Sequence, residues 1–129
     1  MARVNGERRL RAFRAADAFA VEVFRVAVAH PGPALSGLIE AIRRVALRSG
    51  GALVAAAANA PGGAAERRLL ERAKDELVEG RFYLYLARRL GLLDVKRYRG
   101  LTTRQDAALR EVEALLLEPR EQPAARRPP

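Results

Sequence analysis

The stretch LLERAKDELVEGRFYLYLARRLGLL, residues 69–93, decides how this chain folds. Apolar and small residues recur along it at spacings of three, four and seven, which places them on one face of a helix. These residues are Leu69, Leu70, Ala73, Leu77, Gly80, Leu84 and Ala87. Further apolar residues fall off that face, so this helix needs burial on more than one side. They are Val78, Phe82, Tyr85 and Leu86, and we predict that they form an interface with a second subunit.

A basic stripe runs along the same segment. Arg67, Lys74, Arg81 and Arg88 recur every seven residues beside Tyr85. We predict an electropositive edge there, with Arg81 and Arg88 as candidates for ion pairs across the subunit interface.

The composition indicates a single helical domain. A chain of 129 residues is long enough for one hydrophobic core, and its abundant Ala, Leu, Arg and Glu favour helix. Cysteine is absent, which excludes a disulfide framework and a thiolate site. The charged N-terminus lacks the apolar segment of a signal peptide, and no apolar run approaches the roughly 18 residues of a membrane span. We therefore expect a soluble, cytoplasmic protein without a membrane partner.

The net charge of +9 allows two interpretations. Of the 24 basic residues only Lys74 and Lys96 are lysine, and the arginine guanidinium suits phosphate. A GC-rich genome explains the choice of arginine over lysine, but it does not explain the excess of positive over negative charge. That excess favours a nucleic-acid partner.

A first helix is predicted over residues 9–29. Its expected core face comprises Phe13, Ala16, Ala20, Val23, Phe24 and Ala27, and its opposite face carries Arg11, Arg14 and Arg25. The segment His30-Pro31-Gly32-Pro33 ends it. His30 is the only histidine, and we interpret it as a residue at the helix C-terminus.

A second helix is predicted to begin with Ser36 as its N-cap. Its core face comprises Leu38, Ile42, Val45, Ser49, Ala52 and Ala56, and Arg43, Arg44 and Arg48 lie off it. The pair Gly50-Gly51 predicts either a kink or the close approach of another backbone. The glycine-rich residues 59–63 form a loop, and the third helix follows.

A fourth helix, capped by Thr102 or Thr103, presents Leu109, Val112 and Leu116 to the core and ends at Pro119. Between Gly91, a helix C-terminal glycine, and this helix lies a basic turn or short helix. Its Tyr98 either anchors that segment on the core or stacks on a base. The fold class is therefore all-α, an up-down four-helix bundle over residues 9–118 with a disordered basic tail over 119–129.

The chain lacks the residue patterns of common catalytic and metal sites. There is no phosphate-binding glycine loop, and one histidine cannot supply a di-iron bundle site. The acidic residues lie at ion-pair spacing from arginines. We therefore expect no enzymatic activity, no metal and no cofactor.

Short motifs spread over residues 13–117 resemble those of a known superfamily. They are His30-Pro31 with Gly37-Leu38, residues 42–46 (IRRVA), Leu69-Leu70 with Ala73 and Glu79, and residues 85–94 (YLARRLGLLD). The chain resembles small bacterial four-helix-bundle proteins of two branches. One branch is encoded by intervening sequences inside 23S ribosomal RNA genes, and the other is the accessory variability determinant of diversity-generating retroelements.

The chain departs from both branches in places. Residues 49–56 read SGGALVAA where the intervening-sequence branch usually has SIPANIAEG, and residues 115–118 read LLLE where the retroelement branch often has GGW. The basic charge and the segment 90–98 (LGLLDVKRY) are nearer to the retroelement branch. That resemblance implies a ring-shaped homo-oligomer, typically a pentamer, that works with a reverse transcriptase and its template RNA.

We therefore predict a non-enzymatic, oligomeric accessory protein that binds nucleic acid through exposed arginines. The candidates are Arg11, Arg14 and Arg25, then Arg43, Arg44 and Arg48. Binding of this kind recognises the phosphate backbone more than the bases. Two alternatives stay open: an intervening-sequence protein of obscure role, and a protein-interaction scaffold whose charge only keeps it soluble.

Overall fold

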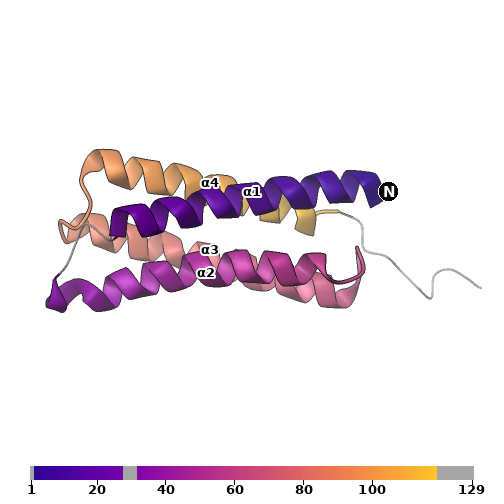
Figure 1. The fold of residues 1–129 in the computed structure, drawn as a ribbon, viewed down its shortest axis with the longest axis horizontal. Coiled ribbons are helices and arrows are strands. Elements are labelled where there is room, and N and C mark those ends of the chain that lie inside the picture. Colours follow the sequence, from indigo (N-terminus) through magenta and orange to yellow (C-terminus); the bar gives the residue numbers. More distant parts are fainter. Residues whose placement is uncertain (1, 28–31, 119–129) are drawn as a thin grey trace, which may run out of the picture.

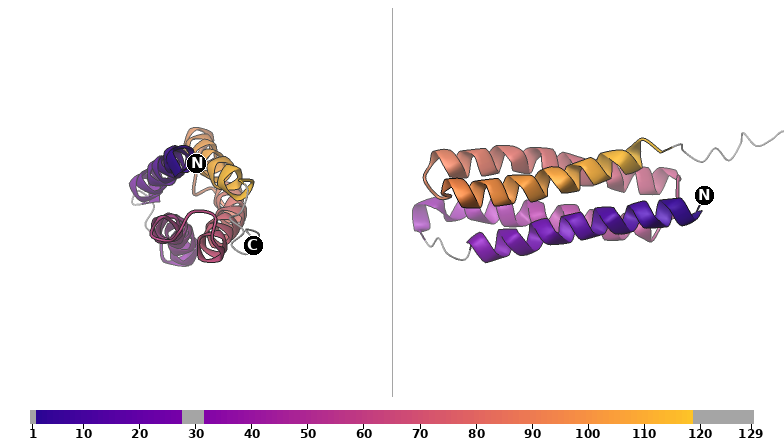
Figure 2. Two further views of the ribbon diagram at one scale, coloured as in Figure 1. Left: turned by 90° about the vertical axis from the view of Figure 1, so that its right-hand side faces the viewer. Right: turned by 90° about the horizontal axis from the view of Figure 1, so that it is seen from above.

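The computed structural model describes residues 2–27 and 32–118, which form four α-helices, one short 3₁₀ helix and no β-strand (Figure 1). The elements are α1 (Ala2–Ala27), η1 (Pro33–Leu35), α2 (Ser36–Ala57), α3 (Ala64–Arg89) and α4 (Val95–Leu116). Each α-helix packs against the next along the chain, and α4 closes the bundle against α1 (Figure 2). The predicted all-α four-helix bundle is therefore confirmed. His30 and the tail 119–129 lie outside the described residues.

One hydrophobic core runs along the bundle axis. Its largest fully buried apolar side chains come from all four helices: Phe19, Val23, Val45, Leu77, Leu84 and Val112. Alanines fill much of the remaining core, among them Ala12, Ala73 and Ala108, each 0% exposed. Small core residues let helices approach closely, as at Gly80, where a Cβ atom would stand 2.7 Å from Val45 Cγ1. The central segment 69–93 therefore provides the core helix that its pattern predicts.

Helix α1 differs from the prediction in its start and in its buried face. It begins at Ala2, not near Arg9. Phe13 and Phe24 are exposed by 44% and 36%, whereas Phe19 is fully buried. The buried face comprises Ala12, Ala16, Phe19, Val23 and Val26. Ala16 and Val23 are therefore confirmed as core, whereas Phe13 and Phe24 were wrong, because α1 is apolar over an arc wider than the core can cover and its periodicity fits more than one buried face. Ala20 is partly buried against the core, and the side chain of Ala27 lies outside the described residues.

Helix α2 confirms most of its predicted core face, with Ile42, Val45, Ser49, Ala52 and Ala56 buried. Its N-terminus differs from the prediction, which placed Ser36 at the N-cap: Ser36 is the first helical residue, and Leu35 occupies the N-cap position. The Ser36 hydroxyl donates to the carbonyl of Pro33 in η1, at 3.0 Å. The helix continues unbroken through Gly50-Gly51, and a Cβ at either glycine would have nothing within 4 Å. The expected close approach of another backbone is therefore absent among the described residues.

The turn between α3 and α4 is set by two capping residues. Gly91 has φ +79°, a left-handed conformation that favours glycine. The Gly91 and Leu92 amides donate to the carbonyls of Arg88 and Ala87, at 3.1 and 2.9 Å, which is the Schellman pattern. The Asp94 carboxylate then accepts from the Arg97 amide at 2.8 Å and caps α4. The expected cap at Thr102 or Thr103 was wrong, because the basic segment around Tyr98 already forms the first turns of α4.

Candidate nucleic-acid interface

The three arginines predicted on α1 are exposed, and two of them meet carboxylates of the same chain. Arg11 lies 3.6 Å from Glu111 of α4, and Arg25 lies 3.4 Å from Glu22. Arg14 forms no ion pair with any described residue. Exposed pairs at these distances hold their partners weakly, so all three guanidinium groups remain accessible to an external anion.

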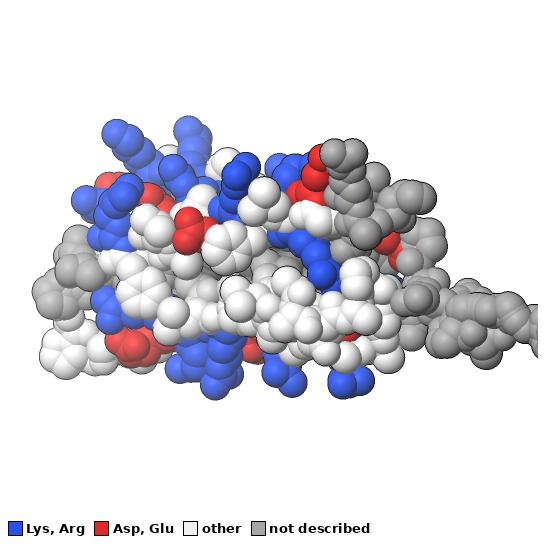
Figure 3. All heavy atoms as spheres, turned by 45° about the vertical axis from the view of Figure 1, so that its right-hand side comes forward, with Lys and Arg blue, Asp and Glu red and all other residues white. Residues whose placement is uncertain are grey.

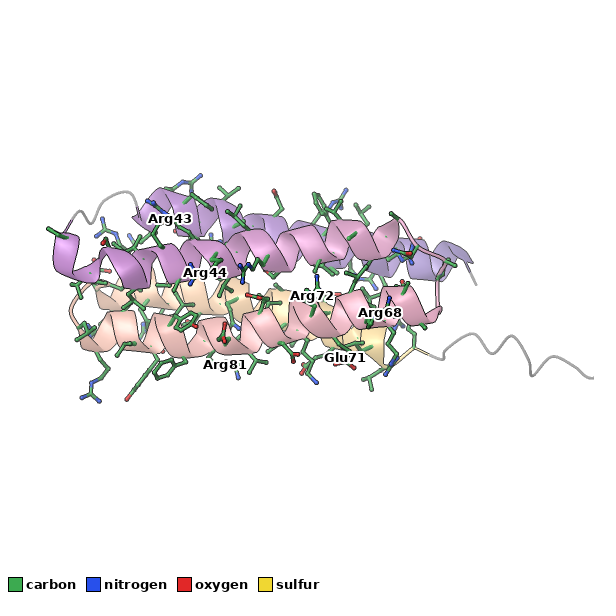
Figure 4. All side chains as sticks on the ribbon, turned by 90° about the horizontal axis from the view of Figure 1, so that it is seen from below. Arg43, Arg44, Arg68, Glu71, Arg72 and Arg81 are labelled. Carbon is green, nitrogen blue, oxygen red and sulfur yellow. The ribbon has the colours of Figure 1, made fainter. Side chains whose placement is uncertain are left out.

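Arg43 and Arg44 of α2 point to different sides of the bundle (Figure 4). Arg43 lies over the Phe24 ring of α1, 5.6 Å from its centroid, and donates to Glu40 at 2.8 Å. Arg44 and Arg48 lie toward α3, where Arg48 is 4.0 Å from Glu76. The structure therefore brings Arg43 next to α1, but it does not join the six predicted arginines into one surface.

The basic stripe of α3 faces α4 and is used within the chain. Arg81 forms a 2.7 Å ion pair with Asp106. Arg67 donates to the carbonyl of Leu116 at 3.0 Å, and Arg88 donates to that of Leu93 at 3.3 Å. In the structure these arginines therefore connect α3 to α4 and to the turn before it. The sequence had instead suggested that Arg81 and Arg88 form ion pairs between subunits.

A dense group of positive charges lies where α3 ends and α4 begins. Residues 88–104 contain six basic side chains and one carboxylate, Asp94. We call this cluster the basic end, and its members are Arg88, Arg89, Lys96, Arg97, Arg99 and Arg104. Arg97 lies 3.7 Å from Asp94, whereas Lys96 and Arg99 form no ion pair with any described residue. Most of this charge is therefore uncompensated locally.

Hydrogen bonds to uncharged groups shape the rest of the basic end. Arg89 donates to the Tyr85 hydroxyl at 3.1 Å and lies 6.0 Å from the centre of that ring. Arg104 donates to the carbonyl of Gly100 at 3.0 Å. These contacts orient guanidinium groups without neutralising them, which suits binding to phosphate.

Helix α1 adds a further cation to the basic end. The Arg11–Glu111 pair fixes the register of α1 against α4, which run in opposite directions (Figure 2). Because both helices rise equally per residue, Arg25, fourteen residues after Arg11, lies level with Arg97, fourteen residues before Glu111. One predicted arginine thus lies beside the cluster that the prediction left out. In the sequence, only the density of basic residues indicates this cluster. The prediction instead relied on the regular spacing of arginines along α1.

The two tyrosines near the basic end, Tyr98 and Tyr85, differ in how far they are buried. Tyr98 is half-buried and packs against the core, so it anchors the start of α4. Tyr85 is 48% exposed, with Val78 and Phe82 exposed by 47% and 57% on the same side of α3. Leu86 is partly buried. Three of the four predicted interface residues therefore expose large side chains to solvent.

One titratable group of α3 has a shifted pKa. Burial raises the pKa of the Tyr83 phenol above its ordinary value, and the neighbouring Glu79 carboxylate acts in the same direction. Both effects keep this phenol protonated at neutral pH, which makes it a poor nucleophile. Within residues 2–27 and 32–118, no cluster of three or more His, Cys, Asp or Glu side chains could hold a metal ion.

None of the described helices combines the length and the apolar character that a membrane crossing needs. Comparison of the chain with protein-family models, with curated proteins and with solved structures finds no match.

Proposed function

We propose that this protein is a non-enzymatic accessory protein that binds nucleic acid through its basic end. The observation that carries the proposal is the concentration of six cations against one carboxylate in residues 88–104. Arg25 is level with this cluster along the bundle axis, and Lys96 and Arg99 have no ion-pair partner in the described part of the chain. Such a surface neutralises several neighbouring phosphates at once and releases their counterions.

RNA is the ligand class that we propose. Arginine forks on helix surfaces contact backbone oxygens in any sequence, so binding is expected to depend weakly on base identity.

The finer proposal comes from the family resemblance. The similarity to retroelement accessory proteins supports a complex with a reverse transcriptase and its template RNA. It also supports a ring-shaped homo-oligomer, typically a pentamer, and the exposed apolar residues of α3 are consistent with self-association. Within such a ring, each subunit would contribute one basic end to the RNA-binding surface.

The test is a comparison of RNA affinity among three proteins of known assembly state. Reversing two unpaired cations of the basic end, Lys96→Glu with Arg99→Glu, is expected to weaken binding of a structured RNA by at least tenfold near 100 mM salt, since about two phosphate contacts are lost. The matched control is Arg68→Glu with Arg72→Glu. It changes the net charge equally at exposed positions in the first half of α3.

The control variant is expected to retain most of the affinity. If both variants lose affinity equally, binding follows net charge and the basic end is not the site. If neither variant changes the affinity, the basic end does not contact RNA.

A further inference from the structure

Two separate apolar surfaces remain exposed on opposite sides of the bundle. The first, the α1–α2 face, carries Phe13, Val21, Phe24, Leu47 and Val54, which are 36% to 62% exposed. The second, the α3 stripe, carries Val78, Phe82 and Tyr85. Helix α3 packs beside α2 and α4, so its outer side turns away from the α1–α2 face (Figure 2).

The α1–α2 face forms a continuous band. Arg43 lies over Phe24, which places this part of α2 beside the C-terminal half of α1. Leu47 follows Arg43 by four residues, about one helical turn, and Val54 follows Leu47 by seven residues, about two turns, so both lie on the same side of α2. In Figure 3 a band of uncharged side chains crosses this side of the molecule, with Lys and Arg above and below it.

The shapes of the two surfaces complement each other. Gly50 and Gly51 separate Leu47 from Val54, and a Cβ at either glycine would meet nothing within 4 Å. The α1–α2 face is therefore low at its centre. On the α3 stripe the central residue is Phe82, 57% exposed, so an aromatic ring projects from the middle. Interfaces commonly place such a ring in a recess of the partner.

The exposed area is of the size that a specific contact uses. A large side chain left half exposed keeps on the order of 80 Å² in water, so the five side chains of the α1–α2 face keep about 400 Å². A standard interface takes about 800 Å² from each partner, with a polar rim around an apolar centre. The α1–α2 face can therefore supply the apolar half of one side.

Charges of both signs flank the two surfaces. Arg14 and Asp17 are exposed beside Phe13 on α1, and Glu71, Asp75 and Arg89 lie along the outer side of α3, where Arg89 donates to the Tyr85 hydroxyl. Docking of the α1–α2 face on the α3 stripe of another copy therefore has opposite charges available on both sides, while the complementary shapes favour contact between unlike surfaces.

We propose that the α1–α2 face of one copy of this chain packs on the α3 stripe of the next copy. Such a contact is heterologous, because two different surfaces meet, and it produces either a closed ring or an open chain of subunits. The inference rests on the proposed self-association and not on the proposed binding of RNA.

Two variants with one defective surface each test this arrangement. The first is Leu47→Glu with Val54→Glu, and the second is Val78→Glu with Phe82→Glu; all four positions are about half exposed or more, so the fold should survive. Each variant alone is expected to be monomeric by light scattering after size exclusion. An equimolar mixture should give a 1:1 heterodimer, because one intact surface of each kind remains. Leu117→Glu, at an 85% exposed position outside both surfaces, is the control and should assemble like the wild type.

Three results would overturn the proposal. A wild-type protein that stays monomeric at about 100 μM would do so, and so would a mixture that stays monomeric. One variant that still self-associates alone would instead show that a surface pairs with itself. RNA affinity of the same variants is measured in parallel, so a failed assembly test with intact RNA binding rejects only the interface.

Discussion

At the scale of single residues, two glycines have structural roles that a side chain would disrupt. Gly80 faces Val45 so closely that a Cβ would stand 2.7 Å from Val45 Cγ1. Gly91 adopts φ +79° at the end of α3. Both lie in the 69–93 segment, which sets the packing of α3 against α2 and the turn into α4.

Gly80→Ala is expected to lower the free energy of unfolding by about 1–3 kcal/mol, because overpacking outweighs the gain of about 1 kcal/mol in helix propensity. Urea denaturation followed by circular dichroism measures this change. The matched control is Gly37→Ala in α2, where a Cβ meets nothing within 4 Å. The control should be neutral or stabilising, and a stabilising Gly80→Ala would refute the close helix contact.

Gly91→Ala is expected to cost about 1–2 kcal/mol, since an L-residue is strained in the left-handed conformation. Gly91→Asn should cost less, because asparagine tolerates that conformation better than alanine does. Equal losses for the two variants in thermal denaturation would argue against a Schellman turn at this position.

Gln105 is a polar residue in the core with only part of its hydrogen bonding satisfied. It is fully buried, and its Nε2 donates to the Leu77 carbonyl at 2.6 Å, while its Oε1 has no partner among the described residues. Gln105→Met keeps the volume and removes the unpaired oxygen, so it should leave stability unchanged or raise it by about 1 kcal/mol. Gln105→Ala should cost about 2–3 kcal/mol because it opens a cavity. Equal losses for both would show that the hydrogen bond to Leu77 is what matters.

At the scale of elements, one ion pair fastens α1 to the turn between α2 and α3. The Arg9 guanidinium binds the Glu66 carboxylate and also donates to the carbonyls of Ala57 and Asn59, at 3.3 and 3.2 Å. Glu66 is only 5% exposed, and its other oxygen accepts from the Gly62 amide at 2.7 Å. Arg9 therefore holds the end of α2 and the start of α3 against α1.

Arg9→Ala is expected to lower the free energy of unfolding by about 3 kcal/mol, because it leaves a buried carboxylate without its cation. Arg11→Ala removes an exposed ion pair from the same helix and should cost less than about 1 kcal/mol. Chemical denaturation compares the two variants. A cost for Arg9→Ala no greater than that of Arg11→Ala would contradict the fastening role.

The positions of the helices could be predicted from the sequence more readily than their faces and ends. Helix α3 has one apolar arc over most of its length, so its periodicity identifies Leu70, Leu77 and Leu84 as core. Helix α1 is apolar over a wider arc, and only packing against α2 and α4 decides that Phe19 is buried and Phe13 is not. Tertiary contacts carry that information, and a single helix pattern does not.

For the candidate site, too, the sequence pattern predicts the exposure of single residues but not their neighbours in the fold. Exposure of Arg11, Arg14 and Arg25 could be predicted from their spacing on one helix face. Their relation to the arginines of α2 could not, since the bundle turns Arg44 toward α3 (Figure 4) and places Arg48 4.0 Å from Glu76 of that helix. The basic end forms because Gly91 and Asp94 reverse the chain tightly, which brings the cations of two helices to one end of the molecule.

At the scale of the whole molecule, charge and apolar surface are segregated. Uncompensated cations concentrate where α3 ends and α4 begins, whereas the α1–α2 face is mostly uncharged (Figure 3). A molecule arranged in this way can associate through its sides and keep its basic end free for a polyanion. Self-association would also multiply the basic ends on one particle, which raises avidity for a long RNA.

The most direct test of the central claim is the affinity of the wild-type protein for a structured RNA across a salt series, with the assembly state checked at each salt concentration. We predict that the logarithm of the association constant falls linearly with the logarithm of salt concentration, with a slope of about −3 or steeper, which corresponds to at least four phosphates neutralised. In the Lys96→Glu, Arg99→Glu variant the slope should be shallower by about 1.5. An absence of binding even at about 50 mM salt would contradict the account, since the basic end would then bind no phosphate backbone at all.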